Sequence, residues 1–236
     1  MVMVLGLFTK RALVIGGAGA LGRAVIKSFK VNWEVTSVDL QPNPEAKQSL
    51  LIQPKDSAET QAATLAKSLQ GKYGAILCVA GGFTMGSIAS ADVFAQWRQM
   101  TELNVMPSLI TAHLATKFLE DQGLLVFTGA AGPFQAPTPG ILAYSLSKNV
   151  VHSLALNMST RTDISSITTV LTILPGILDT PRNRLDMPDA NRSSWVSTEG
   201  VATLLKEWAE NKNRPDNGSY LLLKKNEKDV VVPEFV

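Results

Sequence analysis

A glycine-rich turn between an apolar strand and a helix constrains this chain more than any other feature. The run Ala12–Ile15 leads directly into Gly16-Gly17-Ala18-Gly19-Ala20-Leu21-Gly22, where Gly17, Gly19 and Gly22 have the spacing G-x-G-x-x-G. Such glycines allow a tight turn, close approach of a pyrophosphate and close packing of helix on strand. The free N–H groups at the start of the helix attract the anion. The residues of this predicted dinucleotide site are Gly16, Gly17, Gly19, Ala20, Leu21 and Gly22.

Apolar strands and helical segments alternate along the whole chain. The expected strands are Ala12–Ile15, Trp33–Val38, Ala75–Val79, Gly123–Phe127, Ser166–Leu174 and Ser219–Leu223. The expected helices are Leu21–Lys30, Ser57–Leu69, Asp92–Leu119, Tyr144–Thr160 and Thr198–Asn211. Nearly continuous apolar strands are typical of a parallel sheet covered on both faces. The alternation predicts an α/β fold: a single Rossmann-like domain over residues 1–236, with helices on both faces of a doubly wound parallel sheet.

Composition excludes several functions. The 22 basic and 20 acidic residues leave a net charge of +2, which argues against a nucleic-acid-binding surface. One cysteine and two histidines exclude a disulfide framework and argue against a bound metal. No apolar run approaches the ~20 residues of a membrane span. The N-terminal residues Met1–Phe8 are apolar, but the basic residues come after them, whereas a secretory signal carries its basic residues before the apolar run. We therefore expect a cytoplasmic protein with a short N-terminal extension, with neither nucleic acid nor membrane as partner.

Asp39 is the acidic residue of the predicted dinucleotide site, at the end of the second strand and 22 residues after Gly17. A carboxylate about 20 residues beyond the glycines holds the adenosine ribose hydroxyls, and it would repel a 2′-phosphate. Leu40 and Gln41 follow, so no arginine is at hand to receive that phosphate. We predict NADH as the cofactor, with NADPH weaker. Asp56 either hydrogen-bonds the adenine edge or caps the helix that follows it.

Tyr144 and Lys148 form the candidate catalytic pair. They stand four positions apart in a predicted helix, so their side chains share one helix face. A phenol can donate or accept a proton, with a reference pKa of about 10. A nearby ammonium favours the phenolate, and it can also hold a ribose hydroxyl. The spacing alone is common on surface helices, but after a dinucleotide turn and a fourth strand it indicates an oxidoreductase.

The order of these motifs resembles the short-chain dehydrogenase/reductase family over essentially the whole chain. The further motifs that carry the resemblance are Ala80-Gly81-Gly82, Asn104 in the long central helix and Pro175-Gly176. The resemblance implies that the cofactor is contacted by Ala80, Gly81, Gly82, Asn104, Lys148 and Pro175. The chain departs from the family at Ala131, where a serine usually binds the substrate carbonyl. Thr128 or Ser145 could substitute, although neither stands at the expected position.

The missing serine narrows the resemblance to the dihydropteridine reductases, which regenerate tetrahydrobiopterin. The stretches that carry this likeness are Gly16–Gly22, Ala75–Gly82, His113–Lys117, Leu178–Pro181, Met187-Pro188, Ser193–Trp195 and Asn211–Pro215. Two positions depart from that group. Phe83 stands where a tryptophan is usual, and Asn104 is the residue of the wider family.

The resemblance implies that NADH gives a hydride to a quinonoid dihydropterin. This acceptor is electron-poor and needs less polarisation than a ketone, so an acid without the serine would suffice. We expect neutral Tyr144 to donate the proton, directly or through water. Lys148 is expected to bind the nicotinamide ribose and to tune the acidity of Tyr144. The expected substrate contacts are Phe83, Ala131, Tyr144 and Trp195, with packing an equal alternative for Trp195. The family also implies a homodimer, formed through the helices Asp92–Leu119 and Tyr144–Thr160.

Several alternatives stay open. Thr180 either contacts the nicotinamide amide or caps the next segment, and the irregular stretch Pro181–Trp195 suits a lid. His113 and His152 lie in predicted helices without a paired ligand, which favours structural roles. A carbonyl or alcohol reductase with the same Tyr/Lys pair is the first rival function, and Ala131 speaks against it. A non-catalytic NAD-binding regulator is the second, and the intact pair speaks against that one.

Overall fold

A computed structural model describes residues 10–161, 165, 167–228 and 230–236. Its main sheet is built from the strands β1 (Arg11–Ile15), β2 (Glu34–Asp39), β3 (Gln48–Leu51), β4 (Tyr73–Cys78), β5 (Leu119–Thr128), β6 (Thr169–Pro175), β9 (Tyr220–Lys225) and β10 (Val231–Phe235). Their order is β10-β9-β6-β5-β4-β1-β2-β3. Every pair is parallel except β9 with β10, which form an antiparallel hairpin. The doubly wound parallel sheet expected from the sequence is confirmed.

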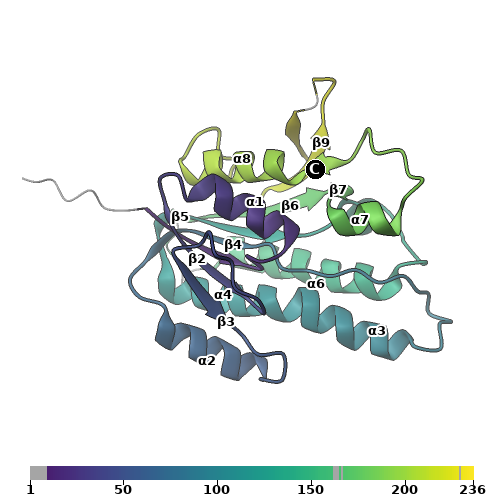
Figure 1. Ribbon diagram of the computed structural model, residues 1–236, viewed down its shortest axis with the longest axis horizontal. Coiled ribbons are helices and arrows are strands. Elements are labelled where there is room, and N and C mark those ends of the chain that lie inside the picture. The colour runs from purple at the N-terminus through teal and green to yellow at the C-terminus, as the bar shows by residue number, and fades with distance from the viewer. Residues whose placement is uncertain (1–9, 162–164, 166, 229) are drawn as a thin grey trace, which may run out of the picture.

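Helices cover both faces of this sheet (Figure 1). The helices are α1 (Ala20–Phe29), α2 (Ala58–Ser68), α3 (Val93–Met100), α4 (Met106–Phe118), α5 (Ala131–Gln135), α6 (Leu142–Ser159), α7 (Pro181–Asp186) and α8 (Thr198–Ala209). Helices α1 and α8 pack on one face, and α2, α4 and α6 pack on the other. Alternate side chains of one strand enter opposite layers, because a strand has a period of two. Val14 of β1 thus joins the α1–α8 core, and Leu13 joins the α2–α4–α6 core.

The long helix predicted over Asp92–Leu119 is found as a continuous helical segment, Val93–Phe118, but it is not a regular α-helix throughout. The segment consists of α3, one π-helical turn over Thr101–Val105 and then α4. Pro107 is the second residue of α4. Proline has no N–H to donate to the carbonyl four residues earlier, so a regular α-helix cannot run through this point without losing a hydrogen bond. The extra residue of a π turn often marks a functional site, and Asn104 lies within this one.

Further segments differ from the sequence predictions, among them the stretch after β6 and the C-terminal strand. The stretch Pro181–Trp195 was expected to be irregular but begins with α7, whose first turn suits Pro181 because that residue needs no N–H partner there. The strand β10 was not predicted, since Pro233 interrupts its short apolar run. Proline is tolerated in this strand because β10 is at the sheet edge.

Two expectations fall on residues without a described structure. The N-terminal extension Met1–Phe8 and the first residue of the strand predicted over Ser166–Leu174 lie outside the described ranges. Within those ranges, none of the helices combines the length and apolar character needed to cross a membrane.

Candidate active site

The glycine turn leaves a bare, uncapped helix end. Gly19 is the N-cap of α1, and no side chain caps the first turn of that helix. A Cβ on Gly22 would lie 2.1 Å from the Gly16 carbonyl oxygen, so only glycine lets α1 approach β1 this closely. A Cβ on Gly19 would meet only the Gly16 oxygen, at 3.3 Å, so the turn is open above that residue. An exposed turn with free N–H groups fits the pyrophosphate of a dinucleotide.

The turn lies where the strand order reverses. Strands β2 and β4 flank β1 on either side, and ligands of open α/β sheets bind outside the carboxyl ends of strands at such a point. Asp39 is the last residue of β2. Its carboxylate accepts hydrogen bonds from the Ala18 N–H at 2.8 Å and the Leu40 N–H at 2.6 Å. The predicted acidic residue is therefore anchored beside the glycine turn.

The catalytic pair projects from α6 toward the same sheet edge. The Lys148 ammonium donates to the Thr128 carbonyl at 2.9 Å and lies 6.0 Å from the centre of the Tyr144 ring. The Tyr144 ring packs edge-on against Phe83, with 5.0 Å between ring centres. Phe83 is 57% exposed and forms an aromatic wall beside the phenol. The structure thus brings Tyr144, Lys148 and Phe83 together.

Burial opposes charge on both members of the pair. It raises the pKa of Tyr144 to about 12 and lowers the pKa of Lys148 to about 8. Loss of solvent around the phenol raises its pKa by more than the nearby ammonium lowers it. Tyr144 is neutral at neutral pH and able to donate a proton.

Asn104 connects the loop after β4 to α6. Its side-chain oxygen accepts from the Gly82 N–H at 2.9 Å, and its amide donates to the Gly82 carbonyl at 3.2 Å and the Ser147 hydroxyl at 2.9 Å. Asn104 is fully buried. A Cβ on Gly81 would lie 2.9 Å from the Asn104 oxygen and 3.3 Å from the Lys148 nitrogen. These contacts make Asn104 a brace between the Ala80-Gly81-Gly82 loop and the catalytic helix. The sequence analysis did not identify Ser147 as the partner of Asn104, because no motif distinguishes a serine inside a helix.

Neither Thr128 nor Ser145 offers a free hydroxyl in place of the usual serine at Ala131. Thr128 donates its hydroxyl to the Cys78 carbonyl at 2.8 Å. Ser145 donates to the Ile141 carbonyl at 3.0 Å and also contacts the Thr138 hydroxyl. Both candidates for substitution are therefore engaged within the protein.

An open cavity of about 580 Å³ adjoins Ala131 and continues past the end of β6. It is lined by Ala131, Gln135, Gly176, Ile177, Ser193, Ser194, Val196 and residues 222–227 of the β9–β10 hairpin. Its walls are mixed, with serine, lysine, asparagine and glutamate beside aliphatic side chains. The hairpin was not expected beside Ala131, because no motif marks these residues, and Tyr144 and Lys148 do not line this cavity.

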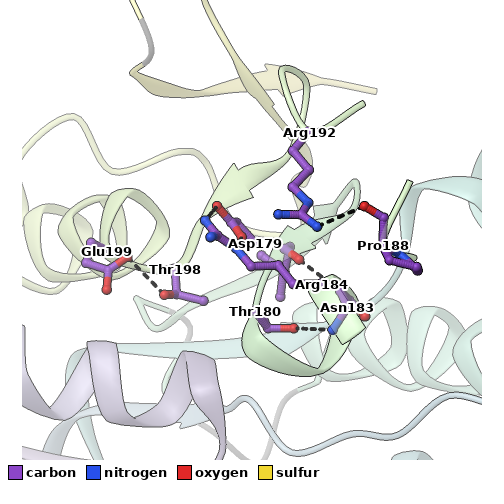
Figure 2. A network of polar contacts seen from close by, with 9 residues as sticks. Asp179, Thr180, Asn183, Arg184, Pro188, Arg192, Thr198 and Glu199 are labelled. Carbon is purple, nitrogen blue, oxygen red and sulfur yellow. Dashed lines mark hydrogen bonds and ion pairs between the residues drawn. The ribbon is translucent and has the colours of Figure 1, made fainter. Parts of the chain in front are cut away.

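The segment beyond β6 is held by polar contacts (Figure 2). Thr180 caps α7 by accepting from the Asn183 N–H at 3.1 Å, which bears out the capping alternative for this residue. Asp179 forms a bidentate ion pair with Arg184, at 2.6 and 2.7 Å. The Arg192 guanidinium lies over the ring of Trp195.

The structure bears on two roles that the sequence left open, those of Trp195 and Asp56. Trp195 is only 2% exposed, which favours packing over substrate contact for its side chain. Ser57, not Asp56, caps α2 by accepting from the Thr60 N–H. The capping role considered for Asp56 is therefore wrong.

The imidazole of His152 makes a structural hydrogen bond that is lost when the ring is protonated. Its Nε2 accepts from the Ala130 N–H at 3.2 Å, and burial lowers its pKa to about 4. The unfolded chain binds the proton first, near pH 6.5. The stability that neutral His152 contributes is thus complete above pH 6.5 and lost as the pH falls toward 4.

We expect His152→Gln to lessen the acid sensitivity of the fold. Between pH 7 and pH 5 the parent should lose on the order of 1–2 kcal/mol more of unfolding free energy than the variant. Urea denaturation at both pH values measures the difference. The exposed His113 provides the control variant, His113→Gln. Equal pH dependence in the parent and His152→Gln would contradict the assignment.

The Rossmann-type sheet, the glycine turn and the Tyr144–Lys148 pair define an oxidoreductase of the dinucleotide-binding class. The chain belongs to the short chain dehydrogenase family, whose model matches residues 10–190.

Known proteins agree with this placement. The chain is 36% identical to a dihydropteridine reductase of Dictyostelium discoideum over 217 residues, which cover 89% of this chain and 93% of that protein. The likeness to dihydropteridine reductases expected from the sequence is confirmed. A short chain dehydrogenase family protein of Francisella tularensis superposes with a TM-score of 0.76 at 19% identity, covering 91% and 96% of the two chains. A blue fluorescent protein from a metagenomic library, solved with NADPH, superposes with a TM-score of 0.74 at 17% identity over 90% and 95%.

Proposed function

We propose that this protein uses NADH to reduce a quinonoid dihydropterin, such as quinonoid dihydrobiopterin, to the tetrahydro form. In that reaction one hydride from NADH and one proton enter the pterin, and NAD⁺ leaves. The role is regeneration of a tetrahydropterin after its oxidation by another enzyme.

The observation that carries the proposal is that Tyr144, half-buried and neutral, stands in a site that lacks the serine. Ala131 lines the cavity, and the hydroxyls of Thr128 and Ser145 are engaged elsewhere. A ketone reductase gains from a second donor on the carbonyl oxygen, whereas a quinonoid pterin is already an electron-poor acceptor. The 36% identity with the Dictyostelium dihydropteridine reductase supports the same choice.

Different residues bind the cofactor, transfer the proton and contact the pterin. Gly16–Gly22 and the start of α1 bind the pyrophosphate, and Asp39 binds the adenosine ribose. Lys148 holds the nicotinamide ribose, while Pro175 and the Ala80-Gly81-Gly82 loop border the rest of the cofactor. The bound NADH supplies the hydride. Tyr144 donates the proton, and Phe83 with Ala131 flanks the pterin.

The decisive assay follows NADH oxidation with quinonoid 6-methyldihydropterin, beside a panel of ketones and 3-oxoacyl compounds. We expect turnover with the pterin and at least a hundredfold lower kcat/KM with the carbonyl compounds. Activity on ketones alone would favour a carbonyl reductase. NADH binding without turnover of any substrate would favour a regulator.

We expect Asp39→Ser to shift cofactor preference toward NADPH. The ratio of kcat/KM for NADH to that for NADPH should fall about tenfold to a hundredfold, because hydrogen bonds to a charged group contribute about 1.5–3 kcal/mol and a repulsive charge is removed. Steady-state kinetics with both cofactors measures the ratio. Glu45→Ser is the matched control, since the Glu45 carboxylate pairs with Lys30 at 3.2 Å in the same loop region. An unchanged ratio in Asp39→Ser would refute this role.

A cytoplasmic homodimer completes the proposal. Large apolar side chains are exposed along α3, α4 and α6, namely Phe94, Trp97, Leu109, Leu146, Val150 and Leu156. Exposed apolar surface of this extent favours association. Light scattering of the purified protein tests it.

A further inference from the structure

One peptide group of the glycine turn is held at both ends by side chains. The Gly17 carbonyl accepts from the Asn43 side-chain amide at 2.8 Å. The N–H of the same peptide belongs to Ala18 and donates to Asp39 at 2.8 Å. Because a peptide is planar, two hydrogen bonds at opposite ends fix its rotation. We call this pair of contacts the peptide clamp.

Asn43 is itself fixed before any cofactor arrives. It is 3% exposed, and its side-chain oxygen accepts from the Glu45 N–H at 2.9 Å. Its backbone N–H donates to the Ser49 hydroxyl at 3.1 Å, and that hydroxyl donates back to the Asn43 carbonyl at 3.0 Å. Ser49 lies in β3, so the clamp connects the glycine turn to the edge of the main sheet.

The clamp acts on two elements of the cofactor site at once. It turns the Gly17 carbonyl toward a buried donor, so that oxygen does not oppose an anion at the turn. It also holds the Ala18 N–H against the carboxylate of Asp39, which has a second bond from the Leu40 N–H. The Asp39 carboxylate thus has a set orientation while keeping lone pairs for a ribose diol.

We propose that Asn43 is a positioning residue for the adenosine half of the dinucleotide. It acts through the Gly17–Ala18 peptide and sets cofactor affinity without contributing to the proton transfer. The inference rests on the proposed binding of NADH and is independent of the pterin. Preorganised sites bind more tightly because less freedom is lost on binding.

The variant Asn43→Ala tests the proposal against a matched control. Asn217 has the same bonding pattern far from the turn: its oxygen accepts from the Val170 N–H at 2.9 Å, and its amide donates to the Ser159 carbonyl at 2.8 Å. Asn217→Ala therefore removes the same two kinds of hydrogen bond, at a more exposed position. Fluorescence titration measures the Kd for NADH in the full-length parent and both variants, at a temperature where circular dichroism shows each to be folded.

We expect Asn43→Ala to raise the Kd for NADH about tenfold and the Kd for ADP by the same factor, because ADP contains only the adenosine half. Asn217→Ala should change neither Kd by more than twofold. In turnover assays the KM for NADH should rise in Asn43→Ala while kcat at saturating NADH stays within twofold. The double variant Asp39→Ser/Asn43→Ala should lose less affinity than the two single variants combined, since both act on one peptide.

Three results would overturn the proposal: a Kd in Asn43→Ala within twofold of the parent, an equal loss in both asparagine variants, or a fall in kcat with unchanged KM. If Asn43→Ala does not fold, Asn43→Ser at the same position serves for the titration. A parent that fails to bind NADH would instead refute the proposed cofactor.

Discussion

Replacing Tyr144 by phenylalanine should lower turnover about 10²- to 10⁴-fold, the range typical of a lost general acid. The ring contact with Phe83 survives the change, so the wall of the site is retained. Within the described residues the Tyr144 hydroxyl has no hydrogen-bond partner, so its removal leaves no protein group unsatisfied. The Kd for NADH should therefore stay within about twofold of the parent value.

Stopped-flow measurement of NADH oxidation at saturating pterin gives the rate of the chemical step. Tyr73→Phe is the control, since it removes a phenol hydroxyl that contacts Arg11 and Thr36 at the opposite, amino-terminal end of β4. Its turnover should match that of the parent. Unchanged turnover in Tyr144→Phe would eliminate the proton-donating role and leave water as the donor.

A methyl group on Gly22 should disable the cofactor site. The added Cβ would lie 2.1 Å from the Gly16 oxygen and 2.7 Å from the Gly17 Cα, both backbone atoms that cannot rotate away. Either α1 shifts or the turn opens, and overpacking of this kind costs about 1–3 kcal/mol of unfolding free energy. Since a hydrogen bond to a charged group contributes about 1.5–3 kcal/mol and about 1.4 kcal/mol corresponds to tenfold in affinity, misaligned N–H groups should lower NADH affinity about a hundredfold in Gly22→Ala.

Calorimetric titration with NADH, together with thermal unfolding, separates the two effects. Gly140→Ala is the matched control, because no atom lies within 4 Å of a Cβ built at that position. It should bind NADH as the parent does. Normal NADH affinity in Gly22→Ala would show that the turn is not the pyrophosphate site.

Local patterns predicted the parts of the fold that depend on near neighbours in the chain. The glycine turn follows from spacing alone, and the Tyr144–Lys148 pair follows from the helical period. The strands β1, β2, β4, β5, β6 and β9 were found from their apolar runs, whereas the edge strands β3 and β10 were not. These features need no knowledge of what packs against them, so the sequence carried enough information.

Features that depend on distant partners were missed. The π turn around Asn104 depends on Pro107 and on the Gly82 backbone, 22 positions away in the chain. Asn43 looks like an ordinary turn residue until the fold places it under the Gly17 carbonyl. The strand β10 contains a proline, and its pairing with β9 could not be recognised from its own residues. Only tertiary structure brings such pairs together.

The β9–β10 hairpin lines the open cavity, whereas the proposed reacting groups stand on a different element. The proposed proton donor stands on α6, whereas the end of β9 and the turn after it, residues 224–227, line the open cavity beside Ala131. That segment belongs to neither the glycine turn nor the helix of Tyr144. Substitutions in this hairpin should therefore change the cavity wall while Tyr144 and Lys148 keep their positions, since neither residue lines that cavity.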